Sequence, residues 1–180
     1  GAGGMNDGNS EKGDHSAKGI KAGNAILVSS GTVAVKSYDD ALHANGGVTL
    51  ENGETSLGTV TLTGGTLTLF SKDDGIHGDG TVTISGGSVR VSGSYEGIEG
   101  SSVVISGGNL SVVSTDDGIN GTATSGTGIR IAGGTLYVLA GGDGAALIAQ
   151  RPKKTCAVVL SYIRSEAIYA AAVRCGAGEC

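Results

Sequence analysis

The feature that most constrains this chain is a repeat of about 22 residues that carries two markers in constant phase. One marker is the last glycine of a Ser-Gly-Gly type of turn, and the other is an acid that precedes a small and an apolar residue. The glycines are Gly31, Gly65, Gly87, Gly108 and Gly134, and the acids are Asp40, Asp74, Glu96, Asp117 and Asp143. Each step between successive glycines equals the corresponding step between successive acids. Stacked units are therefore indicated, with an insertion near positions 44–58 and a smaller one near 122–127.

Within each unit, apolar residues alternate with mostly Thr or Ser on both sides of the glycine turn. Alternation with period two places the apolar side chains on one face of a strand. The expected inward residues are Val60, Leu62, Leu67, Leu69, Val82, Ile84, Val89, Val91, Val103, Ile105, Leu110, Val112, Ile129, Ile131, Leu136 and Val138, joined by Leu42, Ile76, Ile98 and Ile119 after the acids. One unit cannot bury its apolar face alone, but stacked units give a continuous interior.

The pattern therefore predicts an all-β right-handed parallel β-helix, a solenoid of about six coils with roughly 22 residues each. The alternative, an antiparallel sandwich, does not require like residues to recur at a fixed register. The expected organisation is a flexible or paired segment at 1–15, the β-helix at 16–144, and an irregular or partly helical tail or cap at 145–180. Cys156, Cys175 and Cys180 lie in that tail and match no zinc motif; one disulfide with one thiol left over is open.

Charge and hydropathy exclude two partner classes. The formal net charge is -5, and Lys and Arg form no stripe along the repeats, which argues against nucleic acid. No run of about 18 apolar residues is present, so no membrane span is expected. Cations, or ligands reached through cations, are the better expectation.

The acidic markers carry the functional prediction, because stacking brings them into one column with backbones about 4.8 Å apart. Unit charges about 5 Å apart repel by roughly 3 kcal/mol at an effective dielectric of 20, so neutralisation is expected. Carboxylate, amide and carbonyl oxygens are the ligands that Ca²⁺ prefers. The candidate ligands are Asp40, Asp74, Glu96, Glu99, Asp117 and Asn120, with Asp73 and Asp116 beside the column. The alternative is that these acids are solvated turn residues.

Two histidines and two tyrosines accompany the column. His43 and His77 fall at the same position of successive units, which invites a transition metal, although polar corner histidines in contact with solvent are the plainer interpretation. Tyr38 and Tyr95 lie near the corners, where they either stack on sugar rings or cover the corner.

The stretches "KSYDDALHAN", "SKDDGIHGDGTVTISGGSV", "SYEGIEGSSVVISGGNLSV", "STDDGINGT" and "IAGGTLYVLAGGDG" carry a resemblance. The chain resembles the secreted bacterial carbohydrate-binding domain family, which folds as a right-handed parallel β-helix with calcium between its coils. The resemblance covers roughly 16–144 and implies an extracellular or cell-surface location and binding of acidic or plant-type polysaccharide without hydrolysis. It implies calcium ligation by the acidic corners, whereas Lys18 departs from the pattern in the first coil.

Two other functions are weighed against polysaccharide binding. A pectate-lyase-like enzyme needs a base beside the calcium, but Arg90 and Arg130 do not neighbour the acidic column, so no catalytic residue is expected. A solenoid with exposed end strands could also stack end to end as a homo-oligomer or extracellular filament.

Overall fold

The computed structural model describes residues 16–123, 126–141 and 147–149. The described residues form fourteen short strands and no helix. In chain order the strands are β1 (Ile20–Ala22), β2 (Ala25–Val28), β3 (Thr32–Lys36), β4 (Leu42–Ala44), β5 (Thr59–Leu62), β6 (Thr66–Phe70), β7 (Ile76–Ile84), β8 (Ser88–Val91), β9 (Ile98–Ile105), β10 (Asn109–Val113), β11 (Ile119–Gly121), β12 (Ile129–Ile131), β13 (Thr135–Leu139) and β14 (Leu147–Ala149).

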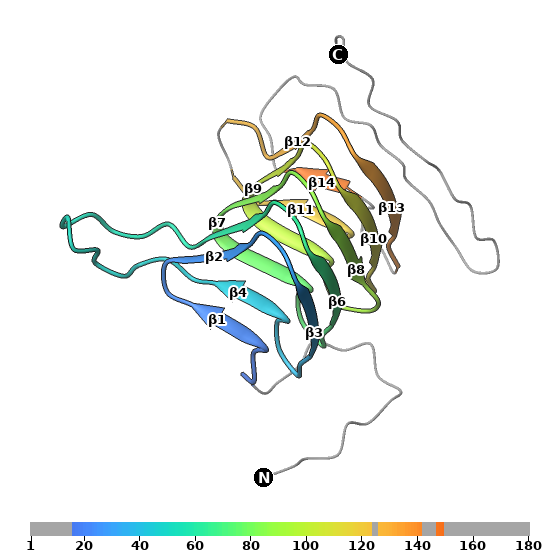
Figure 1. Ribbon diagram of the computed structural model, residues 1–180, viewed down its shortest axis with the longest axis horizontal. Coiled ribbons are helices and arrows are strands. Elements are labelled where there is room, and N and C mark those ends of the chain that lie inside the picture. Colours follow the sequence, from blue (N-terminus) through green and yellow to red (C-terminus); the bar gives the residue numbers. More distant parts are fainter. Residues whose placement is uncertain (1–15, 124–125, 142–146, 150–180) are drawn as a thin grey trace.

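The strands wind into a parallel β-solenoid, as the repeat predicts (Figure 1). All paired strands run parallel, and one sheet stacks β3, β6, β8, β10 and β13 in that order. A larger sheet stacks β1, β4, β7, β9, β11 and β14, while β2, β5 and β12 extend a second branch of it. The long strands β7 and β9 belong to both branches because they bend, with a register shift between Gly78 and Thr81. Each coil thus has three strand segments, and the described residues form five such coils with β14 after them, against the six or so expected.

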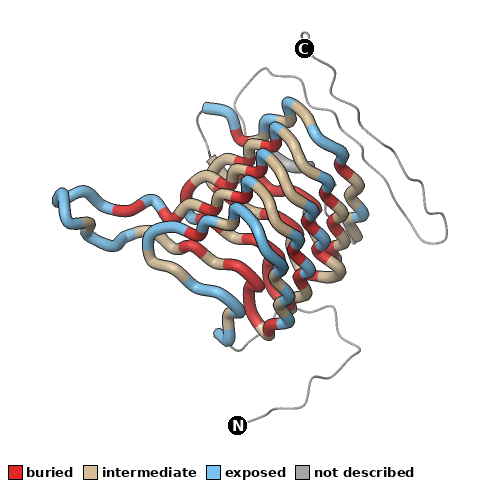
Figure 2. Tube along the Cα trace, viewed as in Figure 1, coloured by how far each residue is buried: buried red, intermediate tan, exposed pale blue. Residues whose placement is uncertain are grey.

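The core fills the interior of the coils and is built by the expected alternation (Figure 2). Strand β7 shows the rule, because Val82 and Ile84 are fully buried whereas Thr81 and Thr83, which alternate with them, are half-buried. Leu42, Ile76, Ile98 and Ile119 after the acids are also fully buried, and each pairs with the next in register. Ile129, Ile131 and Val138 are only partly buried. Like aliphatic residues therefore stack on one another through the solenoid.

The glycine turns keep the coils in register. Gly31, Gly65, Gly87, Gly108 and Gly134 all have positive φ, between 83° and 90°. This left-handed conformation disfavours any residue with a Cβ atom. The amide of each following residue donates to the stacked glycine carbonyl, as in Ser88 N to Gly65 O at 2.9 Å. The predicted turn marker is confirmed at every described coil.

The first insertion leaves the solenoid between β4 and β5 as a projecting loop, drawn in blue-green in Figure 1. Ala44 stacks on Gly78, and Val60 stacks on Val82. The chain from Ala44 to Val60 is much longer than the chain from Gly78 to Val82, so the extra residues form the loop. Thr49 and Thr55 form an antiparallel bridge within the loop. The Ser56 hydroxyl joins the loop to the first coil by donating to Gly23 O at 2.7 Å. The loop is thus anchored at its base.

The last strand departs from the expected register. Continuation of the acidic marker to Asp143 places Ala145 opposite Ile119, but the structure pairs Leu147 with Ile119. The last strand is therefore displaced toward the C-terminus relative to the repeat, and an aliphatic residue takes the register position. β14 falls within the predicted tail, whereas Asp143, the rest of that tail with its three cysteines, and the predicted segment 1–15 lie outside the described residues. Within the described part of the chain, nothing forms an apolar helix long enough to cross a bilayer.

Candidate functional site: a polar column at one corner

The predicted acidic column is assembled by the strand register. Each acid of the column lies two residues before an aliphatic residue that pairs in register with its counterpart on a neighbouring coil. These acids are Asp40, Asp74, Glu96 and Asp117. The neighbouring row brings Asp73, Tyr95 and Asp116 together, since Tyr95 N donates to Asp73 O and Asp116 N donates to Tyr95 O, both at 2.9 Å. Residues from successive coils, far apart in the sequence, thus become neighbours along one edge.

The glycine after Asp74 and after Glu96 allows the coils to close at this corner. A Cβ atom on Gly97 would lie 2.2 Å from Gly118 O and 2.3 Å from Val112 Cγ1. On Gly75 it would lie 2.6 Å from both Gly97 O and Val91 Cγ1. Contacts under 3.0 Å require the structure to shift. Glycine therefore follows these acids because a side chain at that position would collide with the neighbouring coil, whatever the acids themselves bind.

Lys18 neutralises the acids at the N-terminal end of the column. Its Nζ lies 2.9 Å from Asp39 Oδ1 and 2.7 Å from Asp40 Oδ2, and all three side chains are largely buried. Burial opposes the charge on Lys18, but hydrogen bonds to Asp40 and Asp39 outweigh it and raise the pKa of Lys18. Burial likewise opposes ionisation of Asp40, yet its bonds to His43 and Lys18 hold its pKa well below the ordinary value. The basic residue that interrupts the repeat is thus the counter-ion of the next coil.

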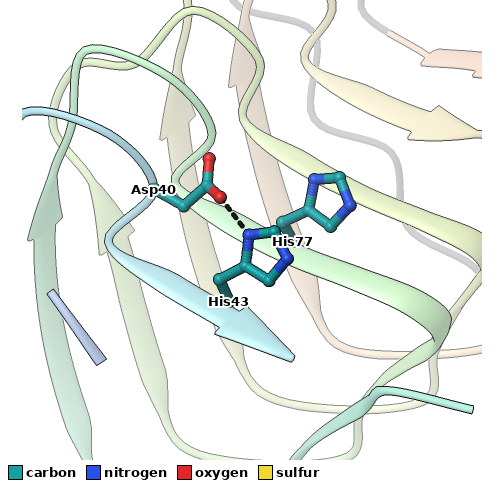
Figure 3. A group of neighbouring side chains, drawn as sticks. All are labelled: Asp40, His43 and His77. Carbon is teal, nitrogen blue, oxygen red and sulfur yellow. Dashed lines mark hydrogen bonds and ion pairs between the residues drawn. The ribbon is translucent and has the colours of Figure 1, made fainter. Parts of the chain in front are cut away.

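His43 and His77 stack in the next part of the column (Figure 3). Their rings are nearly parallel, at 5°, with centroids 4.5 Å apart. His43 Nδ1 contacts Asp40 Oδ2, and His77 Nδ1 lies 2.6 Å from Asp74 Oδ2. Burial opposes protonation of His77, but the hydrogen bond to Asp74 and nearby carboxylates raise its pKa to about 9. Burial also raises the pKa of Asp74, to about 6. Each histidine is therefore oriented by the acid of its own coil.

Glu96, Glu99 and Asn120 form the third part, which contains oxygen ligands and one amide. Asn120 Nδ2 donates to Glu96 Oε2 at 3.1 Å and to Glu99 Oε2 at 3.2 Å. Asn120 is 8% exposed, and its Oδ1 atom is buried without a hydrogen-bond partner. Burial, followed by the hydrogen bond and charge of Glu99, raises the pKa of Glu96 to about 7. Two carboxylates held this close favour a cation between them.

The parts of the column meet closely enough for several groups to share an ion. Ligand atoms lie within 4.8 Å of one another in three sets: Asp40, His43 and His77; Asp74, His77 and Glu99; and Asp39, Asp40 and Asp73. Asp116, Asp117, Tyr38 and Tyr95 are half-buried at the same corner. All the residues predicted for the site are therefore at one edge of the solenoid.

Sequence reasoning missed two members of this corner. Lys18 was noted only as a departure from the pattern, although its position two residues before Ile20 aligns it with Asp40. Asp79 was not singled out, yet its Oδ1 lies 3.3 Å from His77 Nε2 and 3.8 Å from His43 Nε2. The signal for Asp79 was available, because in a strand residues two apart face the same side.

A parallel β-solenoid with a corner column of carboxylates, amide and imidazoles defines a repeat protein whose coils bring potential cation ligands together. The chain belongs to the family described as carbohydrate-binding domain-containing protein, whose model matches residues 1–59 and 54–144. Comparison with curated proteins finds no match, and comparison with solved structures finds none either.

Proposed function

We propose that this protein is a non-catalytic polysaccharide-binding module whose corner column holds Ca²⁺ and acts outside the cell. The observation that carries the proposal is the family match, since its two segments together span the five coils of the solenoid. Membership of a carbohydrate-binding family points to a glycan as the partner. The chemistry of the column supports an acidic glycan in particular.

The Glu96 part of the column supports calcium. It offers carboxylate oxygens from Glu96 and Glu99 and the buried, unpartnered Oδ1 of Asn120. Asp117 and the half-buried Asp116 lie on the next coil of the same corner. Ca²⁺ accepts six to eight oxygen ligands in flexible arrangements, so a set drawn from two coils is suitable. The raised pKa of Glu96 indicates how poorly the site is solvated without a cation.

A calcium ion in this position could also hold a ligand. An ion that keeps part of its coordination shell open binds the carboxylate of a uronic acid, as hard oxygen ligands do. Tyr95, which precedes Glu96 and is half-buried, is the candidate for contact with a sugar ring. Calcium sites with dissociation constants of about 10⁻⁴ to 10⁻³ M are typical of extracellular modules.

The absence of catalysis in the proposal follows from the repetition of the acids. The acid recurs in four of the five described coils, so stacking and ion binding account for its position without a single catalytic site. Arg90 is exposed on β8 and Arg130 on β12, and neither strand belongs to the stack that begins at the acidic corner. Lys18 does lie at the column, but it is held as the charged partner of Asp39 and Asp40 and its pKa is raised, so the arrangement does not favour it as a lyase base.

Affinity electrophoresis in gels containing polygalacturonate tests the proposal. We expect migration to be retarded by added Ca²⁺ and restored by EDTA, because the ion bridges protein and uronate. The double substitution Glu96→Gln and Glu99→Gln should weaken the retardation at least about tenfold, as loss of metal-site groups does. Glu54→Gln, in the exposed loop, is the matched control and should have no effect.

Equal retardation of the double variant and the wild type would contradict the column as the binding site. Absence of any affinity for polygalacturonate or neutral plant glycans would contradict the function. Concentration-dependent fibres without glycan affinity would instead support end-to-end assembly. Release of unsaturated uronides would show a lyase.

A further inference from the structure

The outward edges of the two stacked histidines meet a third side chain that the calcium proposal does not use. His43 on β4 and His77 on β7 are register partners, and Asp79 follows His77 by two residues on the same strand. One oxygen of Asp79, Oδ1, faces both Nε2 atoms, at 3.3 Å from His77 and 3.8 Å from His43. Two imidazoles and one carboxylate therefore converge on one point outside the coil.

The inner nitrogens of both rings are already held by carboxylates. His43 Nδ1 contacts Asp40 Oδ2, and His77 Nδ1 contacts Asp74 Oδ2. In a neutral imidazole whose Nδ1 donates its proton, Nε2 carries a lone pair. Such carboxylate–histidine pairs are the usual support of metal-binding imidazoles, because they orient the ring and raise its basicity. At neutral pH the raised pKa of His77 supplies a proton between that ring and Asp79. At alkaline pH the lone pairs of the neutral rings would face the Asp79 carboxylate, which is unfavourable unless a cation lies between them.

The loop inserted between β4 and β5 positions the carboxylate. Gly46 N, at the beginning of this loop, donates to Asp79 Oδ2 at 3.2 Å and leaves Oδ1 turned to the histidines. Gly80 lies against the same loop, since a Cβ atom there would be 2.6 Å from Leu57 O. The insertion thus supplies a support for Asp79 that a plain coil of the repeat lacks.

The spacing matches a small tetrahedral ion. Zn²⁺ binds histidine nitrogen and carboxylate oxygen at about 2.0 to 2.2 Å, which places tetrahedral ligands ~3.3 Å apart. The two nitrogen–oxygen distances, 3.3 and 3.8 Å, are close to this spacing. The ring centroids are 4.5 Å apart, so the parallel rings must also tilt toward each other at their Nε2 edges. The Asp79 side chain is 48% exposed, whereas those of His43 and His77 are 13% and 21% exposed, so solvent reaches the fourth position.

We infer that His43, His77 and Asp79 form a site for a first-row transition-metal dication, with Zn²⁺ as the best-matched ion. Imidazole nitrogen suits Zn²⁺ and its neighbours, whereas calcium prefers oxygen. The inference stands apart from the proposed polysaccharide function, because it uses the outer edges of the histidines and not the Glu96 part of the column. It assigns one solenoid two cation sites of different chemistry.

Isothermal titration with Zn²⁺ at alkaline pH in excess Ca²⁺ tests this inference, since the calcium occupies oxygen-rich sites. The full chain is used with Cys156, Cys175 and Cys180 changed to serine, because thiolates bind zinc. We expect one Zn²⁺ per chain. Asp79→Asn and His77→Gln should each weaken Zn²⁺ affinity at least about tenfold. Glu54→Gln, which removes an exposed carboxylate from the loop, is the control and should change nothing.

The exposed position of Asp79 makes its substitution the decisive one, because the fold should tolerate it and a thermal melt checks this. Zn²⁺ binding that Asp79→Asn leaves unchanged would overturn the inference, as would absence of Zn²⁺ binding in the presence of calcium. Calcium-dependent retardation by polygalacturonate is measured in parallel and should be unaltered in Asp79→Asn. Failure of one proposal is thereby distinguished from failure of the other.

Discussion

At the residue scale, Glu96 shows how a repeated acid acquires different properties from its copies. Asp40 occupies the same position one coil from Lys18, and ion pairing keeps it charged. Glu96 has an amide and another glutamate as neighbours instead, so burial and Glu99 raise its pKa from 4.5 to about 7. The same repeat position thus holds a paired carboxylate at one end and a carboxylate in need of a cation further along.

The raised pKa of Glu96 predicts a loss of stability with rising pH in metal-free protein. A group whose pKa is higher in the folded state binds its proton more tightly there, so its contribution is full below about pH 4.5 and is lost by about pH 7. Glu96→Gln removes this dependence. In EDTA the variant should melt above the wild type at alkaline pH and match it more closely near pH 4.5, as measured by circular dichroism.

Calcium should reverse the order of the two proteins, because the ion needs the carboxylate that the variant lacks. With calcium at alkaline pH we therefore expect Glu96→Gln to melt below the wild type. Glu54→Gln, on the exposed loop, controls for a change in net charge. The same order of melting temperatures with and without calcium would show that Glu96 does not take part in an ion site.

At the element scale, the coil depends on turns that serve both conformation and stacking. Gly87 has φ of 86°, and a Cβ atom there would lie 2.8 Å from Gly64 C and from Gly65 O on the preceding coil. Gly31 has almost the same φ, 83°, but nothing lies within 4 Å of its Cβ position. Substitution at Gly31 therefore measures the free-energy cost of the left-handed backbone alone. Substitution at Gly87 adds the cost of a collision with the preceding coil.

This pair predicts unequal effects of the same substitution. Gly31→Ala should lower the free energy of unfolding by about 1 to 2 kcal/mol, the cost of left-handed backbone for an L-residue. Gly87→Ala should cost more, because the coils must also separate at the turn. Urea denaturation measures both variants. Equal losses would show that the turn glycines act through φ alone and that coil spacing adjusts freely.

At the scale of the whole molecule, the solenoid is stabilised by neighbour-to-neighbour contacts, and ions between coils would add to them. In such repeat proteins each unit contacts chiefly the next, so a ligand that bridges two units strengthens their coupling. The polar column crosses successive coils at one corner, while the aliphatic stacks hold the interior. Bound cations should therefore influence the unfolding of the entire solenoid.

A thermal melt with calcium and with EDTA measures this contribution directly. An ion that binds only the folded chain stabilises it by RT ln(1 + [L]/Kd), about 2.7 kcal/mol at 100 times Kd. We expect the melting temperature to rise with calcium concentration and to fall on chelation. Magnesium, which demands stricter octahedral geometry, is the control and should stabilise less. An unchanged melting temperature would contradict the proposal that calcium binds between the coils.

Much of this organisation follows from sequence pattern alone. The inward aliphatic positions were predictable from an alternation within a few residues, and the coil length and turn glycines from a spacing that recurs about every 22 residues. The column of Asp40, Asp74 and Glu96 followed as soon as the units were stacked in phase. The register of the last strand was not predicted, because Leu147 and not Ala145 pairs with Ile119.

The sequence by itself determined that the chain coils, which side chains face inward, and that acids share one corner, because periodicity in a parallel stack converts spacing into position. Only the tertiary structure decided how those acids are used. Lys18 pairs with Asp40 across a coil, and Gly46 turns Asp79 toward His43 and His77 from a loop without a counterpart in the repeat. These contacts depend on side-chain direction between non-repeating segments, which no period encodes, and they divide one column into a paired part, an imidazole part and an oxygen part.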